Sequence, residues 1–282
     1  MDTWLVENQT YIRLMAFAFF FILLALWETK RATWPWVAKR RLRWQRHISL
    51  SLFSKVIIRI LFPFLAVTTA FIAQHKGVGY FNEHPMPLWF EIICAMVLLD
   101  VVLYFQHRIM HKISLFWRVH RVHHMDRLLD ISTGLRFHPI EECLTMCFKL
   151  LVVGFIGAPI VAVLLYEILF NAFTMFAHLN VHLSSRTDRI LRWFIITPNM
   201  HRIHHSDYLK ETNSNYGFIL SCWDRIFSSY TPMPITGEFK ISIGLEEFRE
   251  PKFQILENML LVPFNPKRLK VRHKKRLPSR IA

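Results

Sequence analysis

The sequence is short of acidic residues and of charge in general. Asp and Glu number 20 against 35 Lys and Arg, which gives a formal net charge of +15, and no acidic residue follows Glu257. Charged residues make up only 20% of the chain and hydrophobic residues 53%. A basic surface can indicate nucleic-acid binding. Because the apolar residues occur in long blocks, we expect the partner to be anionic membrane lipid and not nucleic acid.

Cysteine is also scarce. The four cysteines are Cys94, Cys143, Cys147 and Cys222. Cys143 and Cys147 are one helical turn apart and could bind a metal. We favour the alternative that they are small apolar residues of a protein in a reducing compartment.

Signals for a cleaved leader and for repeats are lacking as well. The first ten residues, "MDTWLVENQT", carry no basic cluster, and no small-residue cleavage site follows the first apolar run. We therefore expect this run to be a retained anchor. We see no repeat at solenoid periods and no low-complexity linker, so we expect the polar parts to form a cap on membrane helices.

Four apolar blocks reach or approach the ~20 residues that a helix needs to cross a bilayer. They are residues 11–27, 56–73, 88–105 and 150–177. Basic residues are concentrated between the first two blocks and near the C-terminal end: Lys30, Arg31, Lys39, Arg40, Arg41, Arg43, Arg46 and the tail "PKRLKVRHKKRLPSR". Cytoplasmic loops are enriched in Lys and Arg. This pattern predicts a multi-pass, all-α membrane bundle with its basic loop and tail in the cytoplasm and its N-terminus outside.

The fourth block is too long for a single span. Its 28 residues would extend ~42 Å as one helix, beyond the ~30 Å hydrocarbon core. Gly154, Gly157 and Pro159 interrupt it, and such residues break helices. We therefore predict a hairpin of two helices that returns to the cytoplasmic side.

Histidines recur in four motifs of related spacing. The motifs are "HRIMH" (His107, His111), "HRVHH" (His120, His123, His124), "HLNVH" (His178, His182) and "HRIHH" (His201, His204, His205). A random H-x-x-H-H is expected about 0.04 times in such a chain. Residues three and four apart share one face of a helix, so two or three imidazoles of a motif can converge on a metal ion.

Ten imidazoles exceed the ligand capacity of one ion. Five or six ligands suit a five-coordinate or octahedral metal, so ten histidines predict a dinuclear site held by a histidine-rich helical cap on the cytoplasmic side. Imidazole suits Fe, Cu, Zn and Ni, and no Cys or carboxylate stands inside the four motifs to narrow the choice.

Three further residues are candidates for the site. Asp100 and Tyr104 share the helical face of His107 and His111, and an intramembrane carboxylate is a functional candidate. Asp100 could accept a hydrogen bond from a metal-bound imidazole, or could pair with an Arg or Tyr of a neighbouring helix. His138 could cap the helix that we expect to begin at Pro139, or could line the site. "TPN" at 197–199 similarly predicts a helix start.

The four motifs together resemble the fatty acid hydroxylase / sterol desaturase superfamily of integral-membrane di-iron oxygenases. That family's pattern is H-x(3,4)-H, H-x-x-H-H, a later H-x(3)-H and a final H-x-x-H-H. The resemblance covers roughly residues 90–230, including "DVVLYFQHR", "LRFHP" and "NYGFILSCWDRIF". Relatives continue the last stretch to a glycine, where this chain has Ser228.

This resemblance implies two iron ions, molecular oxygen as co-substrate, and electrons from a separate cytochrome b5, ferredoxin or flavoprotein reductase. It implies hydroxylation or desaturation of a lipid C–H bond, in fatty acyl chains, sterols, sphingoid bases, alkylglycerol ethers or carotenoids. It places the protein in the bacterial inner membrane or the endoplasmic reticulum. We divide the chain into N-terminal transmembrane helices with the basic loop (1–87), the di-iron domain (88–235) and a basic cytoplasmic tail (236–282).

Two alternatives remain at this stage. A zinc-dependent membrane hydrolase would need an open zinc position and a general base, for which Glu141 or Glu142 is the nearby candidate. A metal transporter would place polar residues through the bilayer midplane, whereas the histidines here gather at the ends of the apolar blocks.

Overall fold

The computed structural model describes residues 2–36 and 39–265, and these residues form helices and loops without a named strand. The predicted all-α class is confirmed. The α-helices are α1 (Asp2–Arg31), α2 (Arg40–Leu61), α3 (Ala66–Lys76), α4 (Tyr80–Glu83), α5 (Leu88–Lys112), α6 (Ser114–His124), α7 (Pro139–Ile156), α8 (Ile160–Ala177), α9 (Ser185–Leu191), α10 (Pro198–His204), α11 (Leu209–Thr212), α12 (Cys222–Ile226) and α13 (Leu256–Leu261). Short 3₁₀ helices are η1 (Ile131–Leu135), η2 (Glu238–Lys240), η3 (Glu246–Phe248), η4 (Pro251–Gln254) and η5 (Val262–Phe264).

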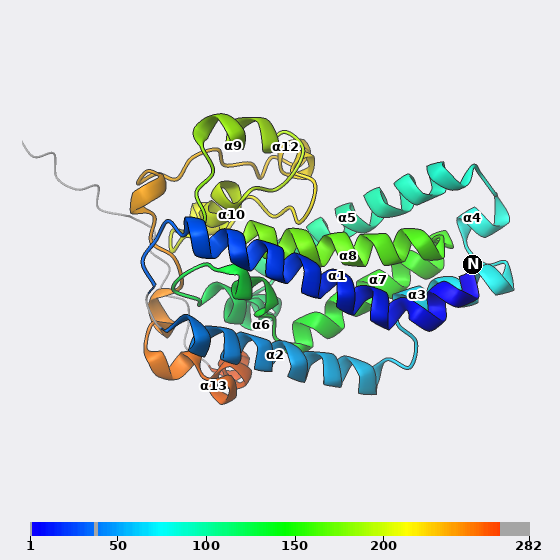
Figure 1. Cartoon of the computed structure of the whole chain (residues 1–282), viewed down its shortest axis with the longest axis horizontal. Helices are drawn as coiled ribbons and strands as arrows, with labels where there is room; N and C mark the ends of the chain where they lie inside the picture. The colour runs from blue at the N-terminus through cyan, green and yellow to red at the C-terminus, as the bar shows by residue number, and fades with distance from the viewer. Residues whose placement is uncertain (1, 37–38, 266–282) are drawn as a thin grey trace, which may run out of the picture.

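The long helices form an elongated bundle. In Figure 1 they run along the long axis, with α1 and α5 packed on α8 and with α2 and α5 packed on α7. The described part of the chain contains four candidate membrane spans by length and composition: Asp2–Arg31, the segment Arg40–Glu83, Leu88–Lys112 and Ile160–Ala177. Many apolar side chains of α1 face outward, and Met15 is 73% exposed. Such a surface suits lipid and not water.

The second candidate span is not one continuous helix. We expected a single apolar block over 56–73, but α2 ends at Leu61 and α3 begins at Ala66. Pro63 lies in the break. Proline has no backbone N–H and disfavours a helical residue before it, so the helix ends just before it. The prediction of a single helix over residues 56–73 is therefore wrong.

The predicted hairpin is present and is longer than expected. α7 and α8 are each 18 residues long and are joined at Gly157–Pro159. Gly157 ends α7 with φ of 64°, a left-handed conformation that favours glycine. A Cβ there would come within 2.5 Å of the Asn82 side chain. Both outer ends of the hairpin, at Pro139 and Ala177, consequently lie at the same end of the bundle.

The short helices and loops form a cap at that end. In Figure 1, α6, α9, α10 and α12 lie at the end opposite the N-terminus. The cap has its own apolar core, which includes Trp117, Val122, Phe248 and Met259. Residues 266–282, which contain the basic tail of the sequence analysis, lie outside the described residues.

One residue of the basic loop is structural and not a surface charge. Arg43 is buried, and its guanidinium donates to both carboxylate oxygens of Asp126 at 2.7 and 2.9 Å and to Asp130 at 2.8 Å. These bonds fasten α2 to the loop after α6. Arg43 therefore does not face the anionic leaflet, as its place in the basic loop had suggested.

Candidate metal centre

Five histidines converge where α5, α6 and α10 meet. They are His107, His111, His120, His124 and His204, and one potential ligand atom from each lies within 4.8 Å of those of the others. His107 and His111 stand in the last turns of α5, whereas His120 and His124 stand one turn apart near the end of α6. We call this set the five-histidine cluster.

Four other histidines form a second cluster beside the first. His123, His178, His201 and His205 also have ligand atoms within 4.8 Å of one another. Nε2 of His178 is the centre of this group, 3.0 Å from Nε2 of His123 and of His201 and 3.1 Å from Nε2 of His205. The rings of His124 and His205 stack with centroids 4.4 Å apart, so this four-histidine cluster adjoins the other.

Local sequence explains why these side chains share their faces. In α6 the i, i+3, i+4 spacing puts His120, His123 and His124 on one side of the helix. Thr197 caps α10 by accepting from the Met200 N–H, and Pro198 occupies the first helical position. The helix start predicted at "TPN" is thus confirmed, and it orients His201, His204 and His205.

Four of the rings are oriented by an acceptor on their outer nitrogen. Nδ1 of His120 lies 2.5 Å from Oε1 of Glu141, and Nδ1 of His178 lies 2.6 Å from the Thr174 carbonyl oxygen. Nδ1 of His107 and of His204 lie 2.7 Å from the carbonyl oxygens of Tyr216 and Ser214. A ring that donates from Nδ1 presents a bare Nε2 lone pair to the cluster.

The donor set fits bound cations. His107 and His120 both donate from Nδ1, yet their Nε2 atoms are 3.1 Å apart with no proton between them. Nε2 of His204 and both ring nitrogens of His111 are buried without a hydrogen-bond partner among the residues that the structure describes. Facing lone pairs repel and buried polar atoms without partners are costly, so cations at the centres of the clusters would satisfy these nitrogens.

Burial keeps these imidazoles neutral. It lowers the pKa of His120 to about 3 and of His178 to about 4. Burial, followed by neighbouring histidines, also lowers the pKa of His123, His204 and His205 well below the ordinary value. Metal ligation requires neutral imidazole, so the rings are in the ligating form at neutral pH.

A loop residue that the sequence analysis missed positions two of the rings. Asn215 stands between Ser214 and Tyr216, whose carbonyls accept from His204 and His107, and has φ of 53°. Its side chain donates to the Met200 and Thr231 carbonyls and accepts from the Thr231 N–H. Asparagine tolerates this left-handed conformation better than most residues do. Its presence in "NSNYG" (213–217) was therefore the sequence signal for such a turn.

His182 does not join either cluster. Its Nε2 lies 3.4 Å from Glu238, and its ring packs on Phe239 and Trp34. Helix α8 ends at Ala177, and the chain at Val181 pairs with Ala32 in an isolated β-bridge. The i, i+4 rule therefore does not apply beyond His178. The prediction that all ten imidazoles meet is wrong for His182 and geometrically right for the other nine.

Asp100 lies away from the clusters. Its carboxylate accepts from Trp223 Nε1 at 2.8 Å, from the Leu220 N–H at 3.1 Å and from the Tyr166 hydroxyl at 3.3 Å. The expected bond from a metal-bound imidazole is wrong, and the alternative of a Tyr partner on a neighbouring helix is confirmed. Asp100 fastens α5 to α8 and to the loop that leads into α12.

Tyr104 and His138 also stand outside the clusters. The Tyr104 hydroxyl lies 2.7 Å from Ser229 Oγ, and its ring stacks on Phe227. His138 caps α7, with Nδ1 accepting from the Ile140 N–H at 3.2 Å. The capping alternative for His138 is therefore confirmed. Neither residue contacts a cluster histidine through these bonds. Tyr104 belongs to α5, which carries His107 and His111, whereas His138 caps α7, which carries Glu141.

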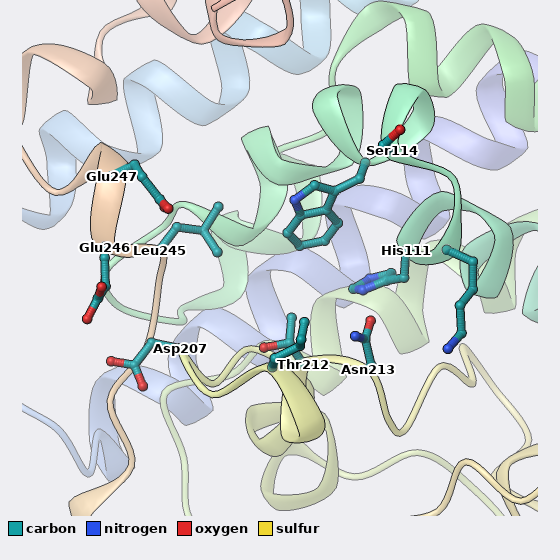
Figure 2. A pocket seen from close by; sticks show the side chains of 11 residues that line it. His111, Ser114, Asp207, Thr212, Asn213, Leu245, Glu246 and Glu247 are labelled. Carbon is teal, nitrogen blue, oxygen red and sulfur yellow. The ribbon is translucent and has the colours of Figure 1, made fainter. Parts of the chain in front are cut away.

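Two cavities reach the five-histidine cluster. The larger one, of about 560 Å³, has His107 and Glu141 in its wall together with Phe137, Phe170 and Phe218. The smaller one, of about 180 Å³, has His111 in its wall. Figure 2 shows the acidic side chains Asp207, Glu246 and Glu247 on the far side of this smaller cavity from His111. The cluster is thus accessible both from within the bundle and from the cap.

Comparison with known proteins agrees with this geometry. The family model for fatty acid hydroxylase matches residues 92–229, which include all nine clustered histidines. Residues 92–229 therefore form a domain of the fatty acid hydroxylase family. Ser228, where the family resemblance led us to expect glycine, has φ of 55°, a left-handed conformation that glycine favours.

The names of several similar proteins indicate that those proteins act on lipids. Ornithine lipid hydroxylase OlsE of Rhizobium tropici is 30% identical over 64% of this chain and 54% of its own length. Alkylglycerol monooxygenase of Xenopus tropicalis is 29% identical over 47% of this chain and 29% of its own. Lathosterol oxidase of Homo sapiens is 28% identical over 67% and 61%. The chain thus covers less than two thirds of each relative. No solved structure matches it significantly.

Proposed function

We propose that this protein is a membrane-bound di-iron oxygenase that hydroxylates or desaturates a C–H bond of a lipid. The observation that carries the proposal is the pair of buried histidine clusters beside a cavity of about 560 Å³ inside an apolar bundle. The hydroxylase, monooxygenase and oxidase relatives support the same reaction class.

Each cluster would hold one iron ion. The five-histidine cluster offers five imidazoles and the four-histidine cluster four, and imidazole is a suitable iron ligand. Bound iron would supply oxidation of an unactivated C–H bond by molecular oxygen, with electrons from a separate donor such as a cytochrome b5, a ferredoxin or a flavoprotein reductase. The nine clustered histidines are the proposed ligands, and His182 is not among them.

The chain's own residues would bind the lipid and exclude water. Phe218 packs against His107 with ring centroids 4.9 Å apart, and Phe137 stacks on His123 at 4.4 Å. Both phenyl rings line the larger cavity, so an apolar chain that fills it is guided past both clusters. A dry, mostly apolar site favours such a substrate. Glu141 would hold the His120 ring by accepting a hydrogen bond from its Nδ1–H.

The clusters would face the cytoplasm. The basic residues between α1 and α2 lie at the cap end of the bundle, where α1 ends at Arg31 and α2 begins at Arg40. The excess of Lys and Arg there supports a multi-pass orientation with the cap inside. An electron donor would then dock on the cap. The division of the chain into three parts, with boundaries after residues 87 and 235, stays a prediction.

The family match favours the oxygenase over both earlier alternatives. A zinc hydrolase would use Glu141 as a base, but this carboxylate accepts from the Nδ1 of His120 and orients a ligand. The family match and the hydroxylase, monooxygenase and oxidase names of the relatives give no support to a metal transporter.

Lipid mass spectrometry tests the proposal. Cells that express the wild-type chain and cells that express His204→Ala would be compared under oxygen. We expect a lipid that gains one oxygen or loses two hydrogens in the wild-type cells only. Indistinguishable lipid profiles in the presence of iron-loaded protein would overturn the proposal.

A further inference from the structure

The larger cavity opens sideways between α1 and α2. Its lining residues on these two helices include exposed side chains: Leu14 is 59% exposed and the Lys55 side chain 60%. Its lining residues near the clusters, such as His107 and Glu141, are buried. In the bundle of Figure 1, α1 and α2 lie apart on one side, with α7 between them. In a membrane this opening would face lipid.

An ionic group stands in the wall of this cavity, deep within the bundle. Nη1 of Arg13 lies 2.6 Å from Oε2 of Glu167, and Nζ of Lys149 lies 3.7 Å from Oε1 of the same carboxylate. The Lys149 side chain is only 12% exposed. Two cations thus share one carboxylate. An uncompensated charge at membrane depth is costly unless a counter-ion reaches it, so it marks a functional site by default.

The charged side chains of the cavity wall are four cations and three carboxylates: Arg13, Lys55, Arg59 and Lys149 against Glu141, Glu142 and Glu167. Lys55 pairs with Glu142, and the Glu141 carboxylate accepts from the His120 Nδ1. Arg59 lines the cavity on the α2 side, and the described residues give it no ion-pair partner. The cavity is therefore electropositive as well as apolar.

The spacing along α7 connects the ionic group with the metal centre. Glu141, Thr145 and Lys149 stand at i, i+4 and i+8, and all three line the cavity. Eight residues of helix rise ~12 Å, so Lys149 lies about that far along α7 from the Glu141 level. The wall between them carries apolar side chains, including Met146 and Phe170.

We propose that the cavity binds an amphiphile with one anionic group, a carboxylate or a phosphate, held by Lys149 beside Arg13. Its apolar chain would run along α7 toward His107, and it would enter from the lipid between α1 and α2. The statement that this amphiphile is a substrate rests on the proposed function, whereas the statement that the cavity binds it does not. It favours charged lipids over neutral sterols or neutral ether lipids as substrates.

Binding to the purified full chain tests this inference without turnover. The protein would be placed in phosphatidylcholine nanodiscs at pH 8, and the affinities of palmitate and of hexadecanol would be measured. These probes have the same chain length and differ in the anionic group. We expect Lys149→Gln to weaken palmitate binding about tenfold or more, because it removes a charge-assisted hydrogen bond, and to leave hexadecanol within twofold. Because the affinity of each probe is compared between the wild type and the variant, the partitioning of that probe into the membrane cancels.

Control variants locate the anion. Lys149→Arg keeps the charge and should retain palmitate binding, and Lys252→Gln, which removes an exposed cation outside the cavity, should change it less than twofold. An equal effect of Lys149→Gln on both probes, or loss of palmitate selectivity in Arg59→Gln alone, would overturn the inference. Inorganic phosphate should not displace palmitate at equal concentration, and displacement would show that small anions suffice. Unchanged elution volume and iron content in Lys149→Gln would show that the variant is folded.

The binding result is separable from the proposed function. Lys149-dependent palmitate binding without any oxygenated or desaturated lipid in cells would refute the oxygenase assignment and leave the anion site standing. Oxygenated or desaturated lipid products without Lys149-dependent palmitate binding would support the oxygenase assignment and refute the anion site.

Discussion

Glu141 on α7 holds His120 on α6 through a contact of 2.5 Å between Oε1 and Nδ1. Both side chains are buried, so water does not compete for the bond. The contact turns the bare Nε2 of His120 toward His107 and His124, each 3.1 Å away. A carboxylate from the hairpin therefore fixes the geometry of the five-histidine cluster.

Glu141→Gln should lower iron affinity and activity by about 10- to 100-fold, the usual effect of removing a partner that orients a ligand. The amide cannot balance the charge of a metal-bound imidazole as a carboxylate does. Iron titration of the purified variant would measure this. Glu142→Gln is the matched control, since Glu142 pairs with Lys55 and not with a histidine. Equal iron binding in both variants would contradict the role of Glu141.

Alanine substitutions should separate clustered histidines from His182. His123→Ala and His204→Ala each remove one ligand from a different cluster, and each should abolish both activity and bound iron at its cluster. His182→Ala should keep full iron content, because this ring packs on Phe239 outside both clusters. Iron analysis and product assays on the three variants check this. Loss of iron in His182→Ala would return that residue to the ligand set.

Asn215 offers a test of positioning by backbone conformation. Asn215→Ala removes three side-chain hydrogen bonds and strains a backbone with φ of 53°, whereas Asn215→Gly removes the bonds but permits the angle. We expect both variants to bind iron more weakly than the wild type. Asn215→Ala should lose about 1 kcal/mol more of the binding free energy than Asn215→Gly. Isothermal titration with Fe²⁺ would measure the difference. Wild-type affinity in Asn215→Ala would exclude the positioning role.

Asp100→Asn should destabilise the protein with iron retained. The carboxylate accepts from Leu220, Trp223 and Tyr166, and an amide offers one acceptor oxygen instead of two. Leaving a buried donor unpaired costs about 1–3 kcal/mol. Thermal unfolding would show a lower Tm, and activity would fall with the folded fraction. An unchanged Tm with lost iron would instead restore Asp100 to the metal centre.

Sequence spacing anticipated most of the two histidine clusters, and the exceptions have physical reasons. The i, i+3, i+4 pattern succeeds in α6 and α10 because those segments are helical through the motif. It fails at His182 because α8 has already ended. The roles of Glu141 and Asn215 depend on contacts between segments far apart in the chain, which local spacing does not encode. Pro63 was visible in the second apolar block and marks where α2 stops.

The fold was predictable to a similar depth. The hairpin at Gly157 followed from helix breakers and bilayer thickness, and the helix starts at Pro139 and Pro198 followed from capping chemistry. The buried bonds of Arg43 to Asp126 were not foreseeable, because a basic residue in a basic loop is ordinarily solvated. The burial of that pair depends on the packing of α2 against the loop after α6, which local sequence does not encode.

The central claim is that two histidine clusters hold two iron ions, and metal analysis tests it most directly. The full chain would be purified anaerobically in nanodiscs, and iron and zinc per polypeptide would be measured by mass spectrometry. The account predicts about two iron atoms per chain, falling to about one or none in His123→Ala and His204→Ala. A single ion per chain, or zinc in place of iron in active protein, would contradict it.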